Sequence, residues 1–184
     1  MLVENSGIDP EVVSERGYYT IVDAGELKRL GFVGAQLRVP ALAIPVHDVA
    51  GELAFTRIRP DHPRPDMTRP ERVVKYEQPP NTGVVLDVPK RCQPYLTDTQ
   101  SPLWVVEGEK KADCLASWGE VVVALLGVGC WKRDGLLLSD WDRIWTIGRE
   151  INIAFDSDVG TKYQVALQRQ RLAAVLERRA GYAG

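Results

Sequence analysis

The second half of the chain alternates short apolar runs with amphipathic segments. Each run is five or six residues long and rich in Val, Ile and Leu, which is typical of strands buried on both faces of a parallel sheet. The segments after the first and third runs space their apolar residues as a helix does. The runs are 103–107 (LWVVE), 121–126 (VVVALL) and 151–156 (INIAFD). This alternation predicts an α/β fold with a mostly parallel sheet flanked by helices.

The first half of the chain follows a different pattern. Asp9 and Asp23 each stand where a helix N-cap is expected, so we predict two short helices. Residues 41–59 alternate apolar and polar positions around a central turn, which predicts a hairpin, and a proline-rich irregular loop follows. The sequence therefore predicts a small α+β subdomain over 1–100 and a second domain over 101–184.

Composition excludes several classes of protein. The 184 residues include 23 basic and 25 acidic residues, so no overall positive charge points to nucleic acid. Three cysteines at wide spacings and two histidines favour neither a disulfide framework nor a zinc site. No apolar run reaches the roughly 18–20 residues that span a membrane, and the N-terminus lacks the pattern of a signal peptide. We therefore expect a cytoplasmic protein that does not bind membranes.

The near-neutral total hides a local excess of positive charge. Between residues 57 and 75 there are six basic side chains against three acidic ones. Such side chains either follow a nucleic-acid backbone or only solubilise a loop. The basic residues are Arg57, Arg59, Arg64, Arg69, Arg72 and Lys75. We favour Arg59 and Lys75 as contacts to nucleic acid or nucleotide, with Arg57 as a further candidate.

Two lysines open the predicted helix after the first apolar run. Lys110 and Lys111 lie in its first turn, where exposed backbone N–H groups favour phosphate. The alternative is a solvated helix face, which fits Lys111 as well as a phosphate contact does. The neighbouring Glu109 is interpreted as a favourable first-turn charge.

Acidic residues stand at the ends of two predicted strands. Glu107 ends the first run, and Asp156 ends the third, with Asp158 two residues further on. Because the carboxyl ends of parallel strands meet at one edge of a sheet, we expect these three side chains to lie together. Clustered carboxylates need a cation, and hard oxygen ligands suit Mg²⁺ or Mn²⁺. The alternative is that all three are only polar strand ends. We favour a metal site suited to phosphoryl transfer or phosphodiester chemistry.

Three segments resemble the Toprim domain of bacterial primases, topoisomerases and some nucleases. The segments are VVEGEKKADCLASWG, ALLGVG and IAFDSDVG. Glu107, Asp156 and Asp158 fall on the glutamate and the Asp-x-Asp pair of that domain. The resemblance implies that Glu107 acts as an acid–base group or a metal ligand, and that the two aspartates bind Mg²⁺.

The resemblance extends upstream to the catalytic core of bacterial replicative (DnaG-type) primases. SGIDPEVVSERGY, IPVHDVAGELAFTRIRPD and VVKYEQPPNTG are similar to the regions before the Toprim domain in those enzymes. Arg59 and Lys75 fall on basic positions there, which implies contacts with template or nucleotide. The E-G-E-K-K-A and F-D-S-D-V runs closely resemble a Toprim-like family found with primase–helicases of phages and plasmids. Two departures stand out: Glu77-Gln78 replaces the Asn-Ser of the primase signature, and we expect the Toprim region to lack its last strand.

The leading hypothesis is a Toprim-type DNA primase core of a mobile element, a phage or a plasmid. It implies nucleotidyl transfer, dependent on Mg²⁺ or Mn²⁺, that makes primers on single-stranded DNA from nucleoside triphosphates. A replicative helicase or a further primase subdomain is the implied protein partner. The alternatives are a metal-dependent Toprim nuclease that uses the same carboxylates, and a non-catalytic replication module that binds nucleic acid or a partner.

Overall fold

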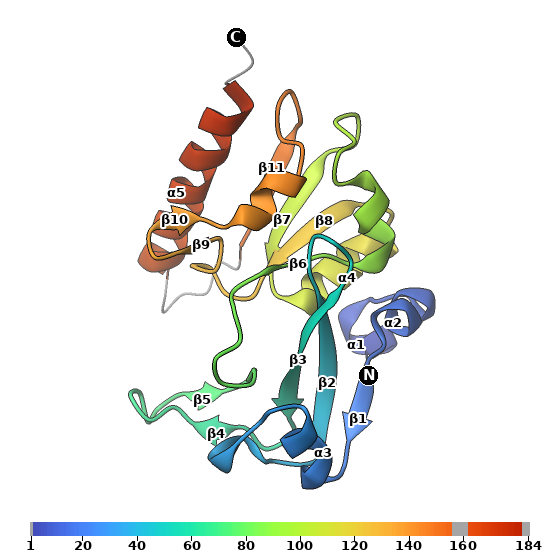
Figure 1. Cartoon of the computed structure of the whole chain (residues 1–184), viewed down its shortest axis with the longest axis vertical. Helices are drawn as coiled ribbons and strands as arrows, with labels where there is room; N and C mark the ends of the chain where they lie inside the picture. The colour runs from blue at the N-terminus through green and yellow to red at the C-terminus, as the bar shows by residue number, and fades with distance from the viewer. Residues whose placement is uncertain (1, 156–161, 182–184) are drawn as a thin grey trace. The chain divides into compact units, whose positions relative to one another are not determined.

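The computed structural model describes residues 2–155 and 162–181, which form two compact units (Figure 1). The first unit comprises residues 1–15, 47–52 and 84–184, and the second comprises residues 16–46 and 53–83. The chain thus passes between the units more than once, whereas the predicted domain boundary lies at residue 100. That domain division stays a prediction.

The first unit contains a four-stranded sheet and most of the helices. In chain order its elements are α1 (Leu2–Ser6), α2 (Pro10–Arg16), β6 (Leu86–Asp87), the 3₁₀ turn η2 (Lys90–Tyr95), β7 (Leu103–Glu107), α4 (Glu109–Ser117), β8 (Val121–Leu125), β9 (Lys132–Arg133), β10 (Leu136–Leu137), the 3₁₀ turn η3 (Ser139–Arg143), β11 (Ile151–Ala154) and α5 (Lys162–Gly181). The three predicted strands and the helix expected after Asp9 are confirmed. In the described part of the chain, no helix is long and apolar enough to cross a bilayer.

The sheet of the first unit has the strand order β11-β7-β8-β6. β11, β7 and β8 run parallel, and Val105 of β7 lies beside Val123 on one side and Ile153 on the other. β6 runs antiparallel to β8 and pairs Leu86 with Leu125. The predicted mostly parallel sheet is therefore confirmed, with one antiparallel edge strand that is too short to leave a periodic signal in the sequence.

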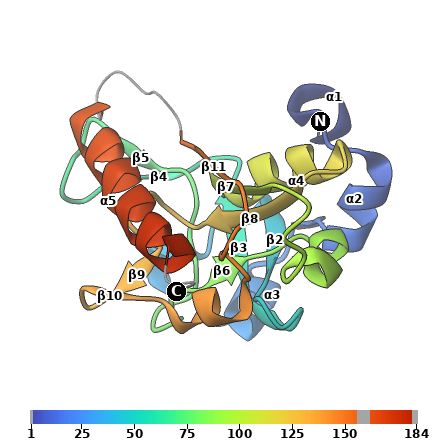
Figure 2. The ribbon, with the colours of Figure 1, turned by 90° about the horizontal axis from the view of Figure 1, so that it is seen from above.

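Helices cover both faces of this sheet. All five residues of β8 are buried, as its continuous apolar run predicts. α4 contributes Ala112 and Ala116 to the core, and α5 contributes Leu172 and Leu176. Figure 2 shows the two helices on opposite sides of the sheet. Each large apolar side chain buried in this way contributes about 1.5–3 kcal/mol relative to an exposed one.

The second unit is built on the three-stranded sheet β1-β2-β3. Its elements are β1 (Tyr19–Ile21), α3 (Ala24–Arg29), the 3₁₀ turn η1 (Gly34–Gln36), β2 (Ala41–His47), β3 (Leu53–Pro60), β4 (Arg64–Pro65) and β5 (Val73–Val74). The predicted hairpin is β2–β3. Asp23 caps α3 as predicted, because its carboxylate accepts a hydrogen bond from the backbone N–H of Gly25 at 2.9 Å. Leu27, Phe32 and Ile58 are buried in a small core of this unit.

Candidate active site

The carboxyl edge of the sheet is the edge at which β7, β8 and β11 end. Glu107 is the last residue of β7 and lies beside Leu125, the last residue of β8. Ala154 ends β11 beside Val106, so the chain leaves β11 at this same edge. Gly108 follows Glu107, donates its N–H to the carbonyl of Leu125 at 2.8 Å and has φ +89°. A residue with a Cβ is strained at this φ, so glycine permits the turn that leads from β7 into α4.

The N-terminus of α4 lies directly after Glu107. Gly108 is its N-cap and offers no side-chain cap, so the first N–H groups of the helix carry partial positive charge. Lys110 and Lys111 stand in this first turn as predicted, and both are half-buried. Glu109 was interpreted as a first-turn charge, and it does lie there, but its side chain is buried with only 2% exposed. A charged residue next to two lysines gives no sequence signal of such burial.

One of the three predicted metal ligands lies among the described residues. Glu107 is half-buried at the carboxyl edge. Asp156 and Asp158 lie outside the described residues. Within residues 2–155 and 162–181, no group of three His, Cys, Asp or Glu side chains is close enough to hold a metal ion. The predicted Mg²⁺ site therefore stays a prediction that rests on the donor chemistry of these three carboxylates.

In the second unit, two predicted arginines lie against the same tyrosine. Arg57 and Arg59 alternate along β3, and their guanidinium carbons lie 5.4 and 5.8 Å from the ring centre of Tyr76. Arg59 is exposed, whereas Arg57 is buried at 9% exposed. The side chain of Tyr76 is partly exposed. The contacts hold both cations over an aromatic face.

Glu77 is a residue whose role the sequence did not suggest. Its backbone pairs with that of Ile58, with N···O distances of 2.8 and 2.9 Å. Its carboxylate is 1% exposed and accepts a hydrogen bond from Arg64 Nε at 2.8 Å. The Glu77 side chain is thus a buried anchor. It fixes the segment that carries Tyr76 against β3.

The six basic residues of the loop divide by their partners. Arg64, Arg69 and Arg72 form ion pairs with Glu77, Asp66 and Glu71 at 2.8, 3.5 and 4.0 Å. Across the part of the chain that the structure describes, neither Arg59 nor Lys75 forms an ion pair, and both are exposed. Arg59 and Lys75 are therefore exposed cations that have no carboxylate partner among the described residues.

The similarity of this chain to proteins of known structure lies in its fold. Residues 93–182 match a family model described as a domain of unknown function, DUF3854. Over 97% of its length the chain is similar to the zinc-binding and RNA polymerase domains of the Aquifex aeolicus primase, at 17% identity and a TM-score of 0.68. A DnaG primase catalytic domain bound to ssDNA matches 94% of the chain, at 20% identity and a TM-score of 0.55. The primase fragment of the bacteriophage T7 primase-helicase protein matches 90%, at 13% identity and a TM-score of 0.52. The chain has a primase-core-like fold.

These matches leave part of each solved structure uncovered. The chain covers 46% of the Aquifex chain, 57% of the DnaG domain and 58% of the T7 fragment. It thus spans less than two thirds of each. No curated protein matches the sequence. At these identities the likeness shows the fold alone.

Proposed function

We propose that the chain is the catalytic core of a Toprim-type DNA primase of a mobile element, which joins nucleotides into primers on single-stranded DNA. The observation that carries the proposal is the position of Glu107. In a chain with a primase-core-like fold, it ends β7 at the carboxyl edge, one residue before the N-terminus of a helix that opens with two lysines. Open α/β sheets bind ligands at this edge.

Each group at the carboxyl edge has a role in the proposed transfer. Glu107, Asp156 and Asp158 would hold Mg²⁺ or Mn²⁺, which offsets negative charge on the triphosphate when bound. Lys110, Lys111 and the N–H groups at the start of α4 bind phosphate oxygens. The 3′-hydroxyl attacks the α-phosphorus of a nucleoside triphosphate, a new P–O bond forms, and pyrophosphate leaves. The Glu107 carboxylate either accepts the hydroxyl proton or serves as a metal ligand.

The second unit would bind the single-stranded template. Arg59 and Lys75 are exposed cations without ion pairs in the described structure, which suits contacts to phosphates. Tyr76 offers a partly exposed ring, and bases stack on aromatic rings of single-strand-binding proteins. The similar DnaG catalytic domain is one that was bound to ssDNA. Template binding is thus assigned to Arg59, Lys75 and Tyr76, with Arg57 supporting the ring. A helicase or a further primase subdomain stays a proposed partner.

Primer synthesis on single-stranded DNA tests the proposed function. The double variant Asp156→Asn, Asp158→Asn is expected to lose at least 100-fold in Mg²⁺-dependent or Mn²⁺-dependent nucleotide incorporation, about 3 kcal/mol of transition-state stabilisation. Asp134→Asn is the matched control, because Asp134 is exposed at the β9–β10 turn and asparagine tolerates its φ of +53°. Incorporation that persists in the double variant contradicts the assignment. DNA cleavage without nucleoside triphosphates would indicate the nuclease instead, and DNA binding without either activity the non-catalytic module.

Single-strand binding by the second unit has its own test. Arg59→Ala and Lys75→Ala are each expected to weaken oligonucleotide binding and to reduce the slope of log K against log salt by about 0.7, because each removes one phosphate contact. Arg69→Ala is the matched control, since Arg69 is an exposed arginine of the same loop that already pairs with Asp66 at 3.5 Å. Fluorescence anisotropy over a salt series measures the slopes. Equal slopes for all three variants would rule out this assignment.

A further inference from the structure

β11 forms one edge of the four-stranded sheet, and its outer side pairs with no described strand. The carbonyl of Glu150 accepts the N–H of Leu103, the first residue of β7, at 2.9 Å. Successive residues of a strand turn their backbone groups to opposite sides, so Asn152 also faces β7, and Ile151 and Ile153 face outward. Neither isoleucine bonds through these backbone groups to another described residue. The edge therefore presents the N–H and C=O groups of both isoleucines.

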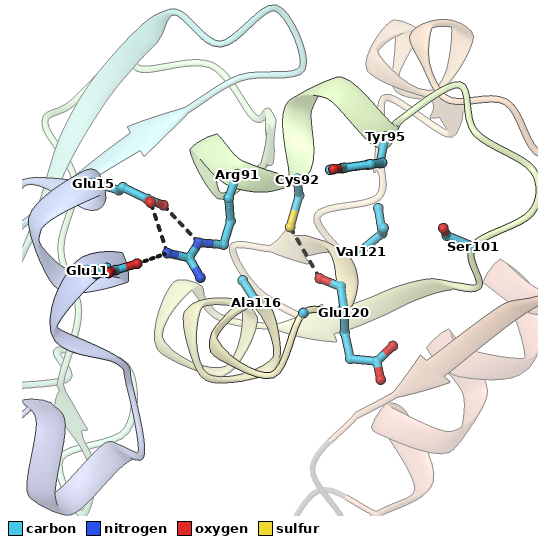
Figure 3. A pocket seen from close by; sticks show the side chains of 10 residues that line it. Glu11, Glu15, Arg91, Cys92, Tyr95, Ser101, Ala116, Glu120 and Val121 are labelled. Atoms are coloured by element: carbon cyan, nitrogen blue, oxygen red, sulfur yellow. Dashed lines mark hydrogen bonds and ion pairs between the residues drawn. The ribbon is translucent and has the colours of Figure 1, made fainter.

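Other boundaries of this sheet are covered. At the opposite edge, the N–H of Leu86 in β6 donates to the Asp140 carboxylate at 2.7 Å, so a side chain takes the place of a further strand. α4 and α5 cover the two faces (Figure 2). Around a cavity at the amino end of the sheet, η2 lies against β8, and Cys92 Sγ donates to the carbonyl of Glu120 at 3.4 Å (Figure 3). The outer side of β11 has no such cover among the described residues.

β11 also lacks the features that usually protect an exposed edge. Natural sheets place charged side chains, prolines or bulges on edge strands, and these prevent pairing with another chain. The sequence of β11 is INIA, without a charge or a proline, and its pairing with β7 is regular. Ile151 and Ile153 are half-buried and line a cavity of about 170 Å³ together with Ala173 and Leu176 of α5. An apolar strand that joined this edge would cover both isoleucines.

A second copy of β11 is complementary to this edge in an antiparallel register. The outward backbone groups belong to Ile151 and Ile153, which lie symmetrically about Asn152. With Asn152 opposite Asn152 of the second copy, each Ile151 lies opposite an Ile153, and such a pair exchanges both of its N–H···O bonds. Every outward group of both copies then has a partner. The residue on the axis meets its own copy closely, and asparagine is neutral, so no like charges oppose each other there.

We propose that two copies of the chain associate through β11, with their sheets joined across a twofold axis at Asn152. The contact is isologous, so it closes after two copies and does not continue into a fibre. On the side that faces α5, the isoleucines of each copy pack beside those of the other and cover the cavity. β11 has four residues, and an interface of this size predicts a reversible dimer. The proposal concerns assembly and does not rest on primer synthesis.

Amide hydrogen exchange of the natural chain, followed by NMR at several protein concentrations, tests the proposal. The N–H groups of Ile151 and Ile153 should exchange at least about twofold more slowly at about 1 mM than at about 50 µM, because pairing removes them from water as the dimer forms. The N–H of Asn152 is the internal control, because it already bonds to β7 and should change little. Sedimentation velocity over the same range should show a reversible dimer.

Charged variants at the axis test the register. Asn152→Lys and Asn152→Asp each place like charges opposite each other, and each should weaken the dimer about fivefold or more at low salt. An equimolar mixture of these two chains should associate again, because opposite charges then meet. Gln170→Lys makes the same charge change at an exposed position of α5 and should dimerise as the natural chain does.

Several results would overturn the proposal. A monomer at every concentration excludes the dimer. A dimer that leaves the exchange of Ile151 and Ile153 unchanged is formed through another surface. A full dimer of Asn152→Lys, or a mixture of the two charged chains that does not associate, contradicts the position of the axis. The exchange measurement uses the natural chain and is independent of how any variant folds. Because association is measured directly, failure here leaves the proposed primase activity untouched, and loss of that activity leaves these tests intact.

Discussion

Glu107→Gln is expected to lower primer synthesis by about 10²–10⁴-fold, the usual contribution of a positioned acid–base group. Glutamine keeps the size of the side chain but cannot accept a proton or offer a full negative charge to a metal ion. The backbone at this position is held by the pairing of β7 with β8 and by the Gly108 N–H bond to Leu125. The fold and DNA binding should therefore be unchanged.

The measurement is incorporation of labelled nucleotide on a single-stranded template, with thermal unfolding and oligonucleotide binding measured beside it. Glu150→Gln is the control, because Glu150 is an exposed glutamate just before β11, at the amino edge of the same sheet. Activity above about one third of the natural level in Glu107→Gln would show that this carboxylate is not part of the reaction. Loss of activity together with a lowered unfolding temperature would assign it a structural role instead.

The position of Glu107 could be predicted because it depends on local patterns. An apolar run that ends in an acidic residue predicts a strand, a following glycine predicts a turn, and an amphipathic segment after it predicts a helix. The observed order is the same: β7, Gly108 and α4. Parallel pairing then brings the strand ends to one edge whatever the details of packing. The buried state of β8 followed in the same way from five consecutive apolar residues.

Features that depend on distant residues could not be predicted. Glu77 belongs to a polar loop, and only the folded second unit brings Arg64 and Ile58 to it. Residues 136–143 contain the two-residue strand β10 and the 3₁₀ turn η3, which are too short to leave a period in the sequence. β6 and the interleaving of the two units along the chain likewise leave no local signal. In each case the missing information is a tertiary partner, which a single sequence does not identify.

Arg149 is the clearest example of such a residue, and Arg149→Met should have the largest effect on stability. Arginine is mostly exposed in folded proteins, and nothing in the sequence around Arg149 indicates otherwise. Its exposed fraction is nevertheless only 5%. Its Nε, Nη1 and Nη2 donate to the carbonyls of Ser101, Leu96 and Tyr95 at 2.8, 3.0 and 3.1 Å. Burial lowers the pKa of its guanidinium, and the nearby Asp98 partly opposes that shift. Arg149 therefore joins the segment before β11 to the segment before β7.

Methionine fills much of the same space but leaves these three carbonyls without their donor. We expect the free energy of unfolding to fall by about 3–5 kcal/mol, as when one partner of a buried charged interaction is removed. That is a large share of the roughly 5–15 kcal/mol that stabilises a typical domain. Arg149→Lys should lose less free energy of unfolding, because an ammonium still donates but cannot reach three carbonyls in one plane.

Urea unfolding measures the free energy of unfolding of both variants. Arg143→Met is the control, because Arg143 is exposed and a change within about 0.5 kcal/mol is expected there. If Arg149→Met unfolds at the same urea concentration as Arg143→Met, the three hydrogen bonds do not stabilise the contact between the segments that precede β7 and β11.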